Sequence, residues 1–204
     1  MQTFAVVRLL LLFAHVMAFA VAFGCVLRED AKLLSPRPID VESLRSAAHL
    51  VRFALIVLWA SGTALIVFDT GGVLSRIADN PKMLAKLTVV CVLTANGVAL
   101  HRLAFPALLG VTRHGGHAAA IAAALGGISA ASWLSATLLG IVRTHAKGFE
   151  YADFMLGYAG MLALALAFAL LVVRPRVLRK LMLGPRWHGP HPPARPGTDL
   201  PHLQ

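Results

Sequence analysis

His15, His49 and His101, three of the nine histidines in this 204-residue chain, lie in or beside the first three long apolar blocks, where ionisable side chains are rare and often functional. If the chain crosses a membrane in alternating directions, His49 and His101 lie at matching depth on neighbouring antiparallel helices. His101 follows Lys86 by 15 residues, about 22 Å of helix, which places it near the same membrane surface as His49. Two such imidazoles can provide the axial ligands of a b-type haem. We therefore consider His49 and His101 a candidate axial pair, with two ordinary interfacial histidines as the alternative.

Arginines lie close to both histidines in the sequence. Arg45 and Arg52 flank His49, and Arg102 directly follows His101. Because a guanidinium binds a carboxylate through two parallel hydrogen bonds, these three arginines are candidate partners for haem propionates. Arg52 also lies within about a turn of a helix end, where a long basic side chain can instead reach the headgroup region.

The helix that contains His101 has a face suited to a flat ligand. Thr94, Gly97 and His101 return to one side of a helix, since residues three and seven apart are neighbours on its surface. Gly97 has no side chain and would let a macrocycle approach the backbone. A comparable stripe is predicted on the preceding helix and consists of His49, Phe53, Ile56, Ala60 and Thr63.

His15 lies near the middle of the first apolar block and has three interpretations. It could hydrogen-bond to a neighbouring helix or to Asn96, act in a proton relay, or replace His49 as the partner of His101. Asn96 is itself a polar residue in mid-helix, for which interhelical hydrogen bonding is the simplest account. Lys86 lies close enough to a helix end for its ammonium group to reach the membrane surface.

Five apolar blocks must position these side chains. The chain is 58% hydrophobic and only 14% charged, whereas soluble domains are about 45–50% apolar and about 25% charged. A helix needs about 20 apolar residues, within a range of about 17–25, to cross the hydrocarbon layer. The blocks that meet this length are residues 9–27, 51–68, 83–105, 118–142 and 154–173. The sequence therefore predicts an all-α fold, a polytopic transmembrane bundle of five helices within residues 1–183.

Local signals mark several helix ends. Asn80 before Pro81 is typical of a capping residue followed by proline at the first helical position. Asp40 can cap the approach to the second block. Pro106 is expected to end or kink the third helix.

Lysine and arginine are distributed unevenly between the two sets of loops. With alternating spans, twelve of these residues fall on the side of the C-terminus and five on the side of the N-terminus. Since cytoplasmic loops carry the excess, we predict that the N-terminus lies outside and the C-terminus in the cytoplasm. Proline-rich residues 184–204 are the predicted disordered cytoplasmic tail. The basic segment after the last span is expected to contact anionic lipid headgroups, and charge spread between apolar blocks argues against a nucleic-acid partner.

The fourth block is rich in small residues at helical spacing. One row consists of Ala118, Ala122, Gly126 and Ala130, and a second of Ser132, Ala136 and Gly140. Small residues let helices approach closely, so this face predicts packing within the bundle, in a homo-oligomer or against a partner. We find no catalytic motif, and no Asp or Glu lies in the interior of a block, which argues against a carboxylate-driven transporter.

Short motifs within residues 9–106 resemble those of a group of small bacterial membrane proteins. They are Trp59-x-x-Gly62, a lysine followed by an apolar run and a histidine (Lys86 and His101), and a histidine in the first helix (His15). The group includes the copper-resistance D-type proteins and the HemJ-type protoporphyrinogen oxidases. This resemblance implies a helical bundle in a bacterial inner membrane, association with haem b and oxidation of a porphyrinogen. It also implies functional roles for His15, Lys86 and His101.

Three functional hypotheses follow. The leading one is a haem-b-binding redox protein that uses His49 and His101, or His15 and His101, as axial ligands. The alternative is a non-catalytic permease or metal-handling protein with His15, Asn96 and Lys86 around an internal cavity. The third is a scaffold or assembly subunit that binds a partner through the small-residue face.

Overall fold

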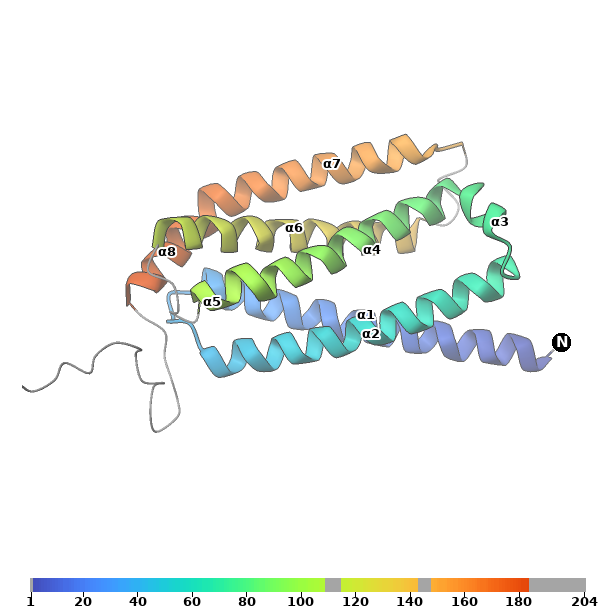
Figure 1. Ribbon diagram of the computed structural model, residues 1–204, viewed down its shortest axis with the longest axis horizontal. Helices are drawn as coiled ribbons and strands as arrows, with labels where there is room; N and C mark the ends of the chain where they lie inside the picture. The colour runs from blue at the N-terminus through green and yellow to red at the C-terminus, as the bar shows by residue number, and fades with distance from the viewer. Residues whose placement is uncertain (1, 109–114, 143–147, 184–204) are drawn as a thin grey trace, which may run out of the picture.

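Five long helical segments make up most of the protein (Figure 1). The computed structural model describes residues 2–108, 115–142 and 148–183. Over these residues the elements are α1 (Gln2–Leu34), α2 (Val41–Thr70), α3 (Leu74–Ala78), α4 (Pro81–Ala99), the π-helical η1 (Leu100–Ala104), α5 (Phe105–Leu108), α6 (Gly115–Ile141), α7 (Tyr151–Phe168), the π-helical η2 (Ala169–Val173) and α8 (Arg174–Leu183). Five segments are long and apolar enough to cross a membrane, and no strand occurs in the described part of the chain. The predicted helical class and the number of spans are confirmed, whereas the predicted tail lies outside the described residues.

Side-chain caps set the starts of two membrane helices. The Asp40 carboxylate accepts hydrogen bonds from the backbone N–H groups of Glu42 and Ser43, which starts α2 well before its apolar block. Asn80 accepts one from the backbone N–H three residues later, at 3.0 Å, and Pro81 takes the first helical position of α4. Such caps satisfy N–H groups that have no partner within the helix. Both predicted caps are confirmed.

Two short π-helical segments interrupt the helices, each just before a proline. η1 ends two residues before Pro106, and η2 ends two residues before Pro175. Proline has no N–H to donate to the preceding turn, and a wider π turn is one way to continue the helix through it. Pro106 therefore distorts the third span, which continues into α5. Since each π-helical segment precedes a proline, Pro106 accounts for the π turn that contains His101.

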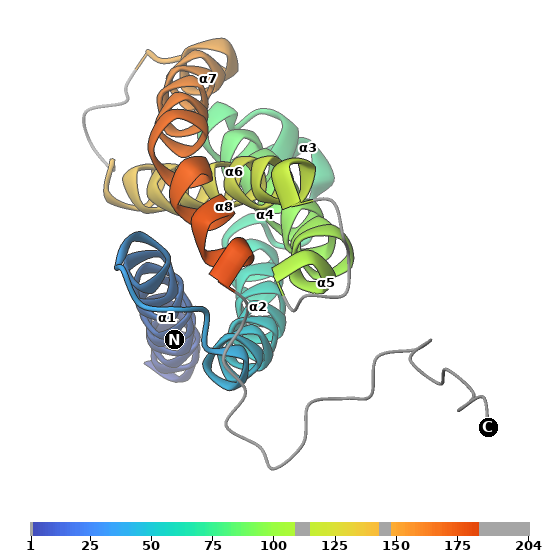
Figure 2. The same cartoon turned by 90° about the vertical axis from the view of Figure 1, so that its left-hand side faces the viewer.

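The central helix of the bundle is α6. It contacts α1, α4, α7 and α8, and Figure 2 shows it between α7 and the α1–α2 pair. Half of its most apolar stretch is buried, compared with 6–22% in the other four spans. Small residues allow this close packing: a Cβ atom on Gly127 would lie 3.0 Å from the carbonyl oxygen of Ala165 and from the Cβ atom of Ala169. Small residues of α6 therefore pack inside the bundle.

Trp133 of α6 connects the α1–α2 pair to the rest of the protein. Its side chain is only 2% exposed. The ring centroid lies 5.4 Å from that of Phe19 and 6.0 Å from that of Phe23, both on α1. Aromatic pairs at this separation contribute about 0.5–1.5 kcal/mol each beyond the burial of their surface. Trp133 also lines both cavities described below, and Phe19 lines one of them.

The last helix, α8, packs on the C-terminal end of α1. Val177 and Lys180 are buried, and the Lys180 ammonium donates a hydrogen bond of 2.7 Å to the backbone carbonyl of Lys32. Arg176 and Arg179 are exposed. The basic segment predicted after the last span is thus a helix with one buried side. We refer to this end of the bundle as the α8 end and to the opposite end as the N-terminal end (Figure 1).

Candidate functional site

Two half-open cavities lie between the helices of the bundle. The α8-end cavity has a volume of about 1320 Å³ and is lined mostly by apolar side chains of α1, α2, α4, α6 and α7. The N-terminal cavity has a volume of about 740 Å³ and is lined by α1, α2, α4 and α6. Small-molecule sites in proteins are typically about 300–1,000 Å³ and largely apolar, with a few polar groups that orient the ligand. Both cavities are therefore large enough for a ligand.

A partition of five side chains separates the two cavities. The residues that line both are Leu55, Trp59, Thr63, Leu93 and Trp133. The indole Nε1 of Trp59 donates a hydrogen bond of 3.0 Å to Oγ1 of Thr94, which connects α2 to α4 at this level. Each cavity therefore reaches the same partition from its own end of the bundle.

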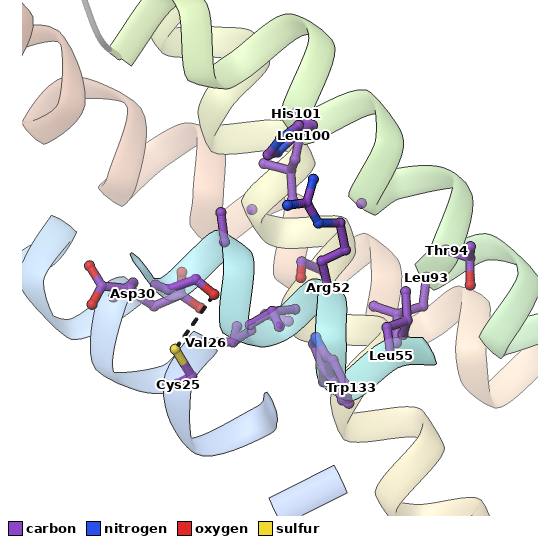
Figure 3. A pocket seen from close by; sticks show the side chains of 18 of the residues that line it. Cys25, Val26, Asp30, Arg52, Leu55, Leu93, Thr94, Leu100, His101 and Trp133 are labelled. Carbon is purple, nitrogen blue, oxygen red and sulfur yellow. Dashed lines mark hydrogen bonds between the residues drawn. The ribbon is translucent and has the colours of Figure 1, made fainter. Parts of the chain in front are cut away.

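His101 lines the α8-end cavity, together with the two residues predicted to share its helix face. Thr94 and Gly97 lie along the same wall, and Figure 3 shows Thr94 and His101 on α4 and its continuation. A Cβ atom on Gly97 would meet no other atom within 4 Å, so there is open space above its backbone. Thr94, Gly97 and His101 therefore line one cavity together.

Two of the three candidate propionate partners line the same cavity. Arg52 and Arg102 do so, and Figure 3 shows the Arg52 side chain extending toward Leu100 and His101. Arg45 on α2 does not line the cavity, and the Arg52, Arg102 and His101 side chains that do line it are exposed at its open side. The cavity thus combines an apolar body with two guanidinium groups and one imidazole.

The structure does not bring His49 into the α8-end cavity. Nη2 of Arg52 lies 2.6 Å from Nδ1 of His49. A guanidinium has only donors, so Nδ1 accepts this hydrogen bond and a neutral His49 ring has its proton on Nε2. In this arrangement neither nitrogen of His49 has a lone pair to offer a metal ion. His49 and His101 lie at the same end of the bundle, as predicted, but do not face one another across the cavity.

Two carboxylates at the rim of the α8-end cavity were missed by the sequence analysis. Glu29 and Asp30 line it from α1, and Figure 3 shows Asp30 apart from Arg52 and His101. Glu29 accepts a hydrogen bond of 2.9 Å from the ammonium group of Lys32. The predicted block ended at residue 27, whereas α1 continues as a helix to Leu34. Residues 28–34 contain no glycine or proline, and this could have indicated that the helix continues beyond the apolar block.

His15 lies in the N-terminal cavity, apart from His101. Its Nδ1 atom is 2.9 Å from Oγ of Ser61 on α2, and a Cβ atom on Gly62 would lie 3.3 Å from Cε1 of His15. The glycine of the Trp-x-x-Gly motif therefore leaves room for the His15 ring. The sequence analysis missed Ser61, although it precedes this glycine directly. A ligand bound by both His15 and His101 would have to extend past the five side chains of the partition.

Lys86 lines the N-terminal cavity with His15, and the two side chains interact electrostatically. Toward the mouth of the cavity, the Arg8 guanidinium donates hydrogen bonds of 2.8 and 3.3 Å to the two carboxylate oxygens of Asp69. Lys82 also lines the cavity, and its ammonium group donates to the carbonyl of Val142. Basic side chains thus dominate the charge of this cavity.

Asn96 faces α6 and lines neither cavity. Its side chain is buried, and Nδ2 donates a hydrogen bond of 3.0 Å to the backbone carbonyl of Leu125. Its Oδ1 atom has no hydrogen-bond partner within the described part of the chain. The interhelical hydrogen bond expected for Asn96 is present.

No cluster of three or more His, Cys, Asp or Glu side chains suited to a metal ion occurs among residues 2–108, 115–142 and 148–183. Comparisons of the chain with protein-family models, with curated proteins and with solved structures find no match.

Proposed function

We propose that this multi-pass membrane protein binds haem b in the α8-end cavity, where His101 would hold the iron. The observation that carries the proposal is that His101, Arg52 and Arg102 line a single large apolar cavity beside the open backbone of Gly97. A haem has an apolar macrocycle, an iron that accepts an imidazole nitrogen and two propionates that pair with guanidinium groups. The donor set on this wall suits each of these three parts.

Of the three candidate histidines, the proposal uses only His101, because His49 and His15 make other contacts. His49 accepts a hydrogen bond from Arg52, and His15 lines the other cavity. His101 would therefore be the one histidine of the α8-end cavity that holds the iron. Haem supplies one-electron redox chemistry when bound. The protein's part is to hold it in an apolar cavity and to neutralise its propionates.

The orientation of the bundle is part of the same proposal. From the excess of Lys and Arg we expect the α8 end, and with it the haem site, on the cytoplasmic side of a bacterial inner membrane. Arg176 and Arg179, exposed on α8, would then lie against anionic headgroups.

Absorption spectroscopy tests the haem site. The protein is produced with excess haem and purified in detergent, and a reduced-minus-oxidised spectrum and a pyridine haemochrome assay measure the haem per chain. We expect a Soret band for the wild type and for His49→Ala, and its loss in His101→Ala. Gly97→Leu should also reduce occupancy, since its side chain would enter the cavity. A wild type without a Soret band, or an unchanged haem content in His101→Ala, would refute the proposal.

A further inference from the structure

The N-terminal cavity contains a histidine that the proposed haem site does not use. His15 lines it from α1, whereas His101, Arg52 and Arg102 line the α8-end cavity and not this one. A ligand of the N-terminal cavity is therefore independent of the haem. What this cavity can bind follows from the hydrogen bonds of the His15 ring and from the side chains around it.

Hydrogen-bond acceptors on α2 hold the proton of the His15 ring on Nδ1. The hydroxyl of Ser61 has one proton, which it donates to the carbonyl oxygen of Val57 at 2.6 Å. Its Oγ atom therefore accepts a hydrogen bond from Nδ1–H of His15, at 2.9 Å. The ring also hydrogen-bonds to the backbone of Leu58, whose carbonyl oxygen lies 3.4 Å from Oγ of Ser61. Since a neutral imidazole has a single N–H, both oxygens share this one donor.

The other nitrogen of the ring, Nε2, is accessible from the cavity. A Cβ atom on Gly62 would lie 3.3 Å from Cε1, 3.7 Å from Nδ1 and within 4 Å of no other ring atom, so the Nδ1 edge packs on α2. The hydrogen bonds of the described residues include none at Nε2 of His15. Among these residues, Oδ1 of Asn96 is the one side-chain N or O atom that is both fully buried and without a partner. In a neutral ring Nε2 therefore offers the cavity an unused lone pair.

The charged groups of the lining interact with other parts of the protein. Arg8 donates to both carboxylate oxygens of Asp69, and Lys82 donates to the carbonyl of Val142. Lys86 has an interaction of its own. We therefore base the site on the uncharged acceptor of the imidazole, which suits an uncharged ligand that donates a hydrogen bond.

Three aromatic side chains line the cavity near His15. Phe19 lies one turn further along α1, about 6 Å of helix, which is room for one ring. Its ring centroid lies 5.4 Å from that of Trp133, and Trp59 lines the cavity from α2. Aromatic rings in contact attract one another beyond the effect of burying their surface. These walls therefore favour a flat aromatic body beside the imidazole.

We propose that the N-terminal cavity binds a compact phenol, an aromatic ring with a hydroxyl group. The hydroxyl donates a hydrogen bond to Nε2 of His15, and the ring of the ligand lies against Phe19, Trp59 and Trp133. Water can form the same hydrogen bond, but only the phenol also covers the apolar walls. The imidazole thus selects a hydroxyl donor, and the aromatic side chains select its apolar body.

Nitrogen NMR with phenol tests this site on the full-length protein in lipid nanodiscs. The histidines are isotopically labelled, and the His15 signals are identified by their absence in His15→Leu. The nitrogen chemical shift distinguishes a protonated from an unprotonated imidazole nitrogen and moves when the latter accepts a hydrogen bond. We expect a His15 ring protonated on Nδ1 alone, and a saturable shift of the Nε2 signal as phenol is added. Anisole, which has the same ring and oxygen but no hydroxyl proton, should leave the signal in place.

Equilibrium dialysis with radiolabelled phenol measures the affinity, with empty nanodiscs as the blank. His15→Leu should weaken phenol binding at least about tenfold, because it removes the acceptor and keeps an apolar side chain. His49→Ala is the matched control: this histidine lines neither cavity, and its removal should leave phenol binding unchanged.

A His15 ring protonated on both nitrogens, equal affinity for phenol and anisole, or equal binding by His15→Leu and the wild type would overturn the proposal. If His15→Leu does not fold, the comparison of phenol with anisole on the wild type decides. Haem content is measured on the same samples, so a failure of the haem proposal is distinguished from a failure of this one.

Discussion

The indole nitrogen of Trp59, which lines both cavities, lies 3.0 Å from the hydroxyl oxygen of Thr94, which lines the α8-end cavity. The Thr94 hydroxyl donates its own proton to the carbonyl of Val90, at 2.8 Å, so its oxygen is the acceptor for Trp59. Trp59 is therefore held in place from α4, and the positions of α2 and α4 are coupled at the middle of the bundle.

Trp59→Phe should lower the free energy of unfolding, because the Thr94 hydroxyl oxygen loses the indole N–H that donates a hydrogen bond to it. The expected loss is about 0.5–1.5 kcal/mol from the hydrogen bond, in addition to that from the smaller ring. Thr94→Val removes the acceptor, and the double variant should be more stable than the sum of the two single losses predicts. Equilibrium unfolding in mixed micelles measures all three, and strict additivity would show that the two side chains are not coupled.

Substitution by alanine should change the stability of the protein differently at the adjacent Gly126 and Gly127 of α6. A Cβ atom on Gly127 would lie 3.0 Å from a backbone oxygen and a side-chain carbon of the α7–η2 segment, whereas one on Gly126 would meet nothing within 4 Å. Gly127→Ala should therefore force α7 away and cost about 1–3 kcal/mol. Gly126→Ala is the matched control and should be neutral or slightly stabilising in the same unfolding experiment. Equal stability of the two variants would contradict the packing of α6 on α7.

The glycine beside His15 provides a second matched pair. A Cβ atom on Gly62 would lie 3.3 Å from the His15 ring, so the ring must shift by a few tenths of an ångström. Gly97→Ala meets open space and should gain up to about 1 kcal/mol from helix propensity. We expect Gly62→Ala to lose most of this gain and to change the NMR chemical shifts of the His15 ring. A His15 signal that is the same in both variants would argue against the contact.

The orientation predicted from loop charges can be measured with a fusion. Green fluorescent protein attached to the C-terminus should fluoresce in a bacterial host, because the α8 end is expected in the cytoplasm. Alkaline phosphatase attached at the same position should be inactive, since it matures outside the cytoplasm. A dark fluorescent fusion together with an active phosphatase fusion would reverse the topology and place the proposed haem site on the outer side.

The number of spans and several helix ends could be predicted because they depend on local properties of the chain. An apolar run of sufficient length specifies a membrane helix wherever its neighbours lie. Asp40 and Asn80 cap their helices through backbone groups two or three residues away. The grouping of Thr94, Gly97 and His101 on one wall also follows from helix periodicity alone.

Only the tertiary structure decided which of the polar residues share a cavity. His49 and Arg52 start from the same turn of α2, yet Arg52 lines the α8-end cavity and His49 does not. His15 and His101 lie on opposite sides of the Trp59 partition. Lipid is as apolar as a helix–helix interface, so hydrophobicity does not reveal which face of a membrane helix points inward. The rotation of each helix about its axis is set by packing. The His15 ring packs on Gly62, and α7 packs on Gly127. Both contacts join residues that are far apart in the sequence.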